Sequence, residues 1–186
     1  MQRHNRDHSL GNGVFFPRED CRGIRARIVI LIVDMIVLVG LCITLGFLYP
    51  VVDAASEITC TLLCLGTVWV YLAVLRQSPI RTPGFWLTKS QIVTLKGERP
   101  SILRMTYRLL LCLVSPFNVV FDLAWSGIDI DRQSLRDRFA GTLLIRHRAK
   151  PIGSGEVHTD LYFLSGFTIL FPRLMYRNEY TTKREA

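Results

Sequence analysis

The 186-residue sequence lacks the motifs on which most enzyme classes depend. It contains no glycine-rich phosphate loop, no CxxC pair and no arrangement of side chains that indicates a nucleophile with its base. His4 and His8 lie in a polar arm, and no further metal ligand lies near them in the sequence. We therefore expect a protein that is not an enzyme and that holds no metal ion or other cofactor.

The five cysteines lack the spacing of a redox motif or a zinc site. Most of them lie within apolar stretches, which favours a role as small apolar residues of membrane helices. Cys60 and Cys64 are four residues apart and share a helix face, so a metal or redox pair is the alternative.

Acidic residues are scarce relative to basic ones, 15 against 23, which gives a formal net charge of +8. In a soluble protein such an excess indicates a nucleic-acid partner. Here the arginines flank apolar stretches and form no separate basic domain, so we expect no nucleic-acid binding. Basic loops that face the anionic headgroups of a membrane explain the charge instead.

Long apolar runs are the dominant feature of the sequence. Hydrophobic residues make up 49% of the chain, the mean hydropathy is +0.28, and the apolar residues are clumped rather than periodic. Residues 28–48 carry one charge, Asp34, and residues 58–75 carry none, so each run predicts a transmembrane helix. The first run is longer than the apolar core of a signal peptide and lacks a cleavage site after it, so we expect it to remain as an anchor in the lipid bilayer.

A third apolar run, residues 109–125, contains Pro116, Asn118 and Asp122. Basic residues lie on both sides of it, which favours a helix that enters the membrane and returns at Pro116 over one that spans. The short stretches before residue 96 and after residue 140 predict strands at the membrane surface. The expected fold class is an all-α membrane protein with two clear transmembrane helices, a third, Pro-kinked hydrophobic helix and short surface strands.

Three segments follow from this division. Residues 1–21 form a polar, irregular N-terminal arm, residues 22–148 form the membrane domain, and residues 149–186 form a C-terminal extension. The apolar stretch at residues 161–172 is too short to span, so we expect it to dock on the membrane surface or on a partner protein. Packing against the helices of the same chain is the alternative.

Loop charges predict the orientation. Residues 1–27 carry six basic residues and residues 76–108 carry seven, whereas residues 50–57 carry none. The positive-inside rule therefore places the N-terminus in the cytoplasm and residues 50–57 outside, in a multi-pass protein that we assign to a bacterial cytoplasmic membrane.

Asp34 is the polar residue that most needs a partner. Arg27 and Asp34 are seven residues apart, within about 20° of one helix face but about 10 Å apart along the axis, too far for an ion pair within the helix. A carboxylate inside a span costs roughly 2.5–3.5 kcal/mol to insert, so it faces other helices and pairs. We expect Asp34 to pair with Arg104 or Arg108, or else with Arg136 or Arg138, and Asp137 to hold other arginines at the cytoplasmic surface.

The sequence resembles the RDD family of small membrane proteins in three residues. They are an arginine at the start of the first span, an aspartate seven residues later, and an aspartate after the third apolar run. The matching residues are Arg27, Asp34 and Asp137, with Arg25 as the alternative arginine, and Ile30 stands where the family often has a small residue. The resemblance covers about residues 22–148. It extends to the segment between the second and third runs and to "AGT" at 140–142, and so includes Gly84, Lys89, Gly97, Arg104 and Arg108.

The resemblance supports a membrane class more than a mechanism, so two functions stay open. The first is an accessory or structural subunit of a membrane complex, with other membrane subunits or further copies of this chain as partners. The second is a small ion or proton-coupled transporter in which Asp34 titrates. A water-filled cavity at Asp34 favours transport, and a dry, arginine-paired Asp34 favours structure. The predicted polar network comprises Arg27, Asp34, Arg104, Arg108 and Asp137, supported by Arg25, Gly84, Lys89, Gly97, Arg136 and Arg138.

Overall fold

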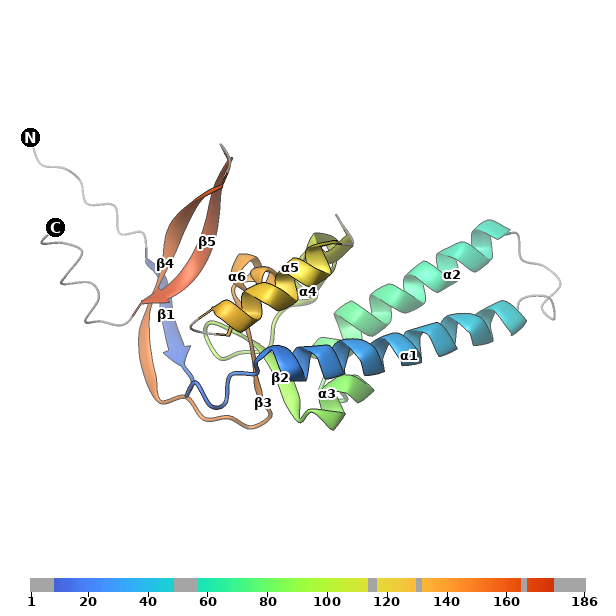
Figure 1. The fold of residues 1–186 in the computed structure, drawn as a ribbon, viewed down its shortest axis with the longest axis horizontal. Helices are drawn as coiled ribbons and strands as arrows, with labels where there is room; N and C mark the ends of the chain where they lie inside the picture. The colour runs from blue at the N-terminus through green and yellow to red at the C-terminus, as the bar shows by residue number, and fades with distance from the viewer. Residues whose placement is uncertain (1–8, 49–56, 114–116, 130–131, 165–166, 176–186) are drawn as a thin grey trace, which may run out of the picture.

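A long helical hairpin projects from the rest of the molecule (Figure 1). It appears in the computed structural model, which describes residues 9–48, 57–113, 117–129, 132–164 and 167–175. Helix α1 (Ile24–Leu48) has 25 residues, and α2 (Glu57–Trp69) returns beside it and continues as a π-helix, η2 (Val70–Leu75). At 1.5 Å per residue, α1 is about 37 Å long, which exceeds the hydrocarbon core of a bilayer.

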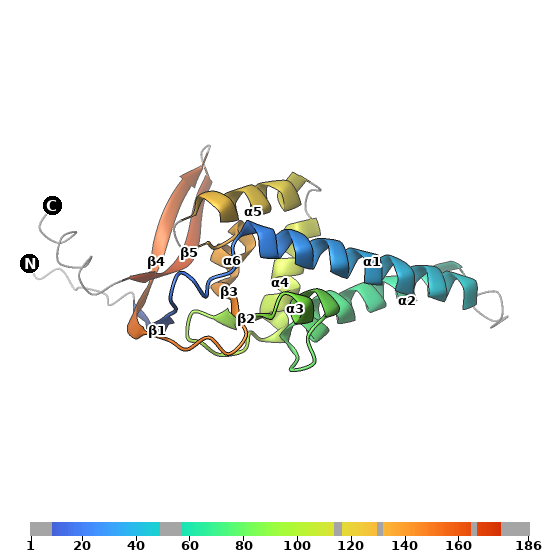
Figure 2. The same cartoon turned by 60° about the horizontal axis from the view of Figure 1, so that its bottom comes forward.

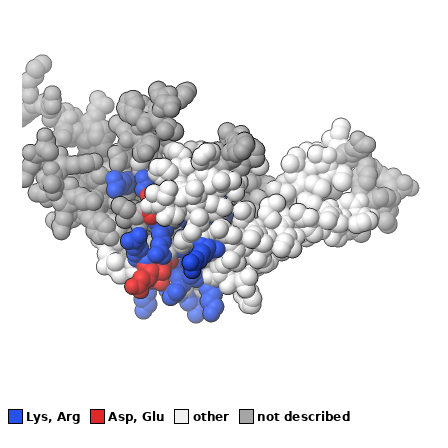
Figure 3. Space-filling view, viewed as in Figure 1, with Lys and Arg blue, Asp and Glu red and all other residues white. Residues whose placement is uncertain are grey.

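The hairpin has the length and surface of a membrane-spanning unit. The stretches Ile24–Phe47 and Ile58–Leu75 are long and apolar enough to cross a membrane, and only 17% and 11% of their most apolar windows are buried inside the protein. Core helices of a soluble protein would be mostly buried, whereas Ile36 and Phe47 of α1 are largely exposed. The visible face of the hairpin is free of charge, and the charged side chains on this face gather near its base (Figure 3). Most of the predicted outer loop, residues 50–57, lies outside the described residues.

The described residues of the third apolar run lie in two short helices, and the predicted Pro-kinked helix stays a prediction. Helices α4 (Ile102–Leu113) and α5 (Phe117–Ile128) have 12 residues each and reach about 18 Å, too short to cross a bilayer. Helix α5 runs back alongside the first half of α1 (Figure 2), and Gly127 near its end lies close to Ile24. The predicted return point, Pro116, lies outside the described residues.

The prediction of an all-α fold is wrong, because strands make up 20% of the chain. Strands β1 (Ser9–Phe15), β4 (Gly153–Leu164) and β5 (Phe167–Met175) form an antiparallel sheet in the order β1-β4-β5. Part of the arm that the sequence predicted to be irregular is therefore a strand. The described part of the apolar stretch at 161–172 lies in β4 and β5, and its docking on the membrane surface or on a partner stays a prediction.

The two predicted strands are confirmed as β2 (Ser90–Thr94) and β3 (Thr142–Arg146), which pair with each other and are mostly buried. Side chains alternate across this ribbon, so its two faces join different cores. Ile92 and Leu144 pack with residues of α1, η2, α3 and α4, while Val93, Leu143 and Ile145 pack with β4. The ribbon thus connects the membrane helices to the three-stranded sheet.

Two short helices bring polar groups to the base of the hairpin. Helix α3 (Pro83–Leu87) starts with proline, whose fixed φ suits the first helical position. Helix α6 (Leu135–Ala140) starts with a capping box between Ser134 and Asp137 and ends at Gly141, which has a φ of +60°. Along the chain, α3 comes directly before β2 and α6 directly before β3.

Candidate functional site: a buried aspartate–arginine network

Asp34 lies at the base of the hairpin with 1% of its surface exposed. Its Oδ1 accepts hydrogen bonds from the Tyr71 hydroxyl at 3.1 Å and from the Gly84 N–H at 3.0 Å. Its Oδ2 accepts from Arg76 Nη2 at 2.9 Å, from Arg76 Nε at 3.3 Å and from Thr82 Oγ1 at 3.0 Å. The carboxylate is therefore paired with an arginine and hydrogen-bonded on both oxygens, although the arginine is neither Arg104 nor Arg108.

The π-helix η2 explains how Tyr71 and Arg76 both reach Asp34. In an α-helix, residues five apart point about 140° away from each other. A π-helix closes its hydrogen bonds from residue i to i+5, so residues five apart are separated by about one turn. Tyr71 and Arg76 consequently lie on the same face, and the Arg76 guanidinium also rests on the Phe85 ring at 5.6 Å from its centroid.

Gly84 allows α3 to approach α1 closely. The N–H of a residue in a first helical turn has no partner inside the helix, and that of Gly84 is directed at Asp34. A Cβ at this position would lie 2.7 Å from Asp34 Oδ1 and 2.8 Å from the Ile30 carbonyl oxygen. The close packing of α3 on α1 therefore depends on Gly84, which lies opposite Ile30, rather than on a small residue at position 30.

Asp137 forms the second centre of the network and is completely buried. Its carboxylate binds the guanidiniums of Arg27 and Arg108, and it also accepts from Thr142 Oγ1 at 3.2 Å and from the Ser134 N–H at 3.3 Å. Burial acts to raise the pKa of Asp137, but the charges of Arg108 and Arg27 outweigh it and hold the pKa well below the usual carboxyl range. Asp137 is thus a fixed negative charge between α1 and α4.

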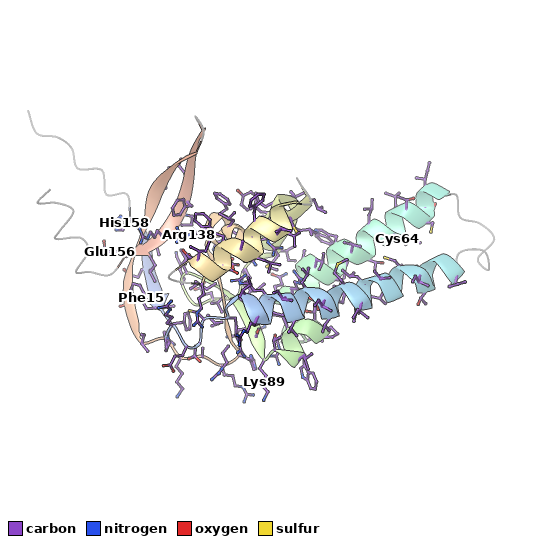
Figure 4. All side chains as sticks on the ribbon, in the orientation of Figure 1. Phe15, Cys64, Lys89, Arg138, Glu156 and His158 are labelled. Carbon is purple, nitrogen blue, oxygen red and sulfur yellow. The ribbon has the colours of Figure 1, made fainter. Side chains whose placement is uncertain are left out.

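Two further ion pairs extend the network. Asp122 of α5, which is 1% exposed, accepts from the Arg136 backbone N–H and from its Nε, each at 2.8 Å. Asp129 pairs with Arg138, which lies between the helices and the three-stranded sheet, with its guanidinium 5.5 Å from the Phe171 ring centroid (Figure 4). The two ion pairs attach α5 and the residue that follows it to α6, and the contact of Arg138 with the Phe171 ring attaches α6 to β5.

Several predicted residues lie outside the network. Arg104 is exposed on α4, where its N–H contacts Ser101 Oγ at 3.4 Å, and Arg25 is exposed on α1, so Arg27 is the arginine that enters the site. Lys89 and Gly97 are turn residues.

Lys89 has a φ of +48°, and its carbonyl oxygen accepts from the His147 N–H at 2.8 Å and from Arg22 Nη2 at 3.2 Å. Its side chain lies at the edge of the molecule, away from the network (Figure 4). Gly97 has a φ of +81° in the turn after β2, and a Cβ there would lie 2.8 Å from Val14 Cγ2. Both positions shape loops rather than the charged site.

The sequence reasoning missed Tyr71, Arg76 and Thr82 as partners of Asp34, and Asp122 as the partner of Arg136. The sequence position of Arg76 could have predicted its pairing with Asp34, because Arg76 is the first charged residue after the second apolar run. In a hairpin of two spans, the end of the second lies beside the start of the first, which is where Asp34 lies. No comparable pattern marks Thr82, which the loop between η2 and α3 brings to the site.

An elongated cavity of about 440 Å³ lies between α1, α2 and α4 and reaches Asp34. Its walls are mainly apolar, and Arg76, Arg108 and Arg136 also line it. Among the described residues, no group of three or more His, Cys, Asp or Glu side chains could hold a metal ion.

Two membrane-capable helices with a buried aspartate–arginine network at their base define a membrane protein. The model of the RDD family matches residues 21–141, nearly the region predicted from the sequence, and the chain belongs to the RDD family. The predicted membership is confirmed. No curated protein and no solved structure matches the chain.

Proposed function

We propose that this protein is an accessory or structural subunit of a membrane complex, without enzymatic activity, in a bacterial cytoplasmic membrane with its N-terminus in the cytoplasm. In this proposal the aspartate–arginine network fixes how the helices pack and so presents a defined surface to partner subunits. The observation that carries the proposal is the environment of Asp34. Its two oxygens accept five hydrogen bonds, two of them from Arg76.

The reason is energetic. A carboxylate that releases and takes up protons in a transport cycle needs access to water. Asp34 is only 1% exposed, and a guanidinium, two hydroxyls and a backbone N–H donate to its two oxygens. Each aspartate of the network also joins separate helices: Asp34 joins α1 to η2 and α3, Asp137 joins α6 to α1 and α4, and Asp122 joins α5 to α6.

Purification in mild detergent tests this proposal. The tagged protein is isolated from native membranes, and its assembly size and co-purifying membrane proteins are determined. We expect a complex of defined stoichiometry, either with other subunits or with further copies of this chain. The Asp34→Asn variant should lose that complex, while Asp20→Asn, whose ion pair with Arg146 is long and exposed, should retain it. A monodisperse monomer without partners would contradict the proposal.

The second candidate function is transport of an ion coupled to protons, and the cavity that reaches Asp34 favours it. Proteoliposomes loaded with a pH-sensitive dye test it by measuring proton movement driven by a sodium or potassium gradient. Transport predicts a flux in wild type and Asp20→Asn that Asp34→Asn abolishes without a loss of stability. The structural role predicts no flux above that of empty liposomes in any of the three proteins.

A further inference from the structure

The cavity between α1, α2 and α4 is an apolar groove with a cationic end. Its long walls consist of aliphatic and sulfur-containing side chains. On α1 they extend from Leu31 to Ile43, and Leu72 of η2 and Leu109 of α4 face them. From Asp34 to Ile43 the groove follows nine residues of α1, or about 13 Å.

The groove is accessible from the membrane side. Val39 and Ile43 on α1 are 50% and 53% exposed, and Leu113 on α4 is 67% exposed, although all three line the groove. Since these positions lie on the apolar part of the molecule, the medium at the entrance is lipid rather than water.

Arginines lie at the closed end. Arg76, Arg108 and Arg136 line the groove, and the same three line an adjoining cavity of about 50 Å³ together with Arg27. Arg76 places two nitrogens on Asp34, and Arg136 places two on Asp122, which leaves one terminal nitrogen of each guanidinium outside these ion pairs.

The charges around the closed end do not balance. Four arginines, Arg27 and the three that line the groove, face three aspartates, because Asp137 binds both Arg27 and Arg108. The arginines also act on each other: burial lowers the pKa of Arg108, Asp137 opposes this, and the charge of Arg136 lowers the pKa further. One more negative charge at this end would neutralise the excess positive charge.

We propose that the groove binds one acyl chain of an anionic phospholipid and that the lipid phosphate is bound by Arg76, Arg108 and Arg136. An acyl chain fits an apolar channel that opens to the bilayer, and guanidiniums bind phosphate oxygens through several directed hydrogen bonds. The proposal extends beyond the structural role, because it assigns a ligand to a cavity that helix packing alone does not require.

Native mass spectrometry and thermal unfolding of the full chain in detergent test the proposal. The probes are palmitoyl-oleoyl phosphatidylglycerol, phosphatidylcholine with the same chains, the matching diacylglycerol without phosphate, and inorganic phosphate. We expect one phosphatidylglycerol to stay bound and to raise the unfolding temperature. Phosphatidylcholine should bind at least several-fold more weakly, and diacylglycerol or inorganic phosphate should cause no shift.

Groove-filling variants keep the network intact. Val39→Trp and Leu113→Trp place an indole in the groove from α1 and α4, and we expect each to reduce phosphatidylglycerol retention about tenfold. Ile36→Trp is the matched control, since Ile36 is exposed on α1 but does not line the groove, and it should retain the lipid. Equal retention by Val39→Trp and wild type, or diacylglycerol binding as strong as that of phosphatidylglycerol, would overturn the proposal. Neither result would affect the subunit proposal, which depends on the isolated complex.

Discussion

Replacing Asp34 with asparagine should destabilise the protein strongly although the side chain keeps its size. The carboxylate accepts bonds on both oxygens, whereas an amide accepts on one atom and donates from the other. Whichever way the amide turns, either Tyr71 and Gly84 or Arg76 and Thr82 lose their acceptor. The Thr82 hydroxyl can rotate and accept a bond, but the Arg76 guanidinium cannot accept and is left without its counter-charge.

The size of the effect follows from the burial of this pair. Removing one partner of a fully buried ion pair costs roughly 3–5 kcal/mol, because the other charge is left uncompensated. Asp34 is buried, but the Arg76 side chain retains 16% of its exposure and its guanidinium also contacts Phe85. We therefore expect Asp34→Asn to lower the free energy of unfolding by about 2–4 kcal/mol.

Unfolding in mixed detergent micelles, followed by circular dichroism, measures this change. Asp20→Asn is the matched control, because its partner Arg146 lies 3.7 Å away and is well exposed, and it should change stability by less than about 1 kcal/mol. In a double-mutant cycle, Arg76→Gln should cost less in the Asp34→Asn background than in wild type. A value for Asp34→Asn within error of Asp20→Asn would refute the reasoning.

Three further predictions follow from the same region. Gly84→Ala should destabilise by about 2 kcal/mol or more, because its Cβ meets Asp34 and Ile30, whereas Gly66→Ala in α2 has open space and should be neutral or stabilising; thermal unfolding compares them. The lowered pKa of Asp137 means that its contribution to stability is complete above about pH 4 and is lost as the pH falls toward the folded-state pKa, so Asp137→Asn should flatten the acid limb of a stability profile measured from pH 7 to pH 3. In intact cells, a cysteine at position 55 of a cysteine-free variant should react with an impermeant thiol reagent, and one at the exposed Lys96 should not; the reverse would overturn the orientation.

The strands show which part of the fold the sequence could reveal. The ribbon of β2 and β3 was predictable, since short β-prone stretches border clear turns. The pairing of β1 with β4 was not, because Ser9–Phe15 contains two glycines and is polar at its start, and its partner Gly153–Leu164 lies far along the chain. Strand pairing across such a distance depends on tertiary packing, here of Val157 against Leu95 and Ile145.

The ion pairs also divide into features that the sequence predicts and features that only the tertiary structure decides. The sequence alone determined that residues 28–48 and 58–75 form apolar helices and that Asp34 needs a cationic partner, because hydropathy and the cost of burying a charge do not depend on neighbours. It also placed Arg27 and Asp34 on one face of α1, since helical periodicity is local. Only the tertiary structure decided that Arg76 pairs with Asp34 and that Arg108 pairs with Asp137. That choice depends on the π-turn in η2, on the return of the chain at Gly84 and on the position of α6, and each of these results from packing between elements that are distant in the sequence.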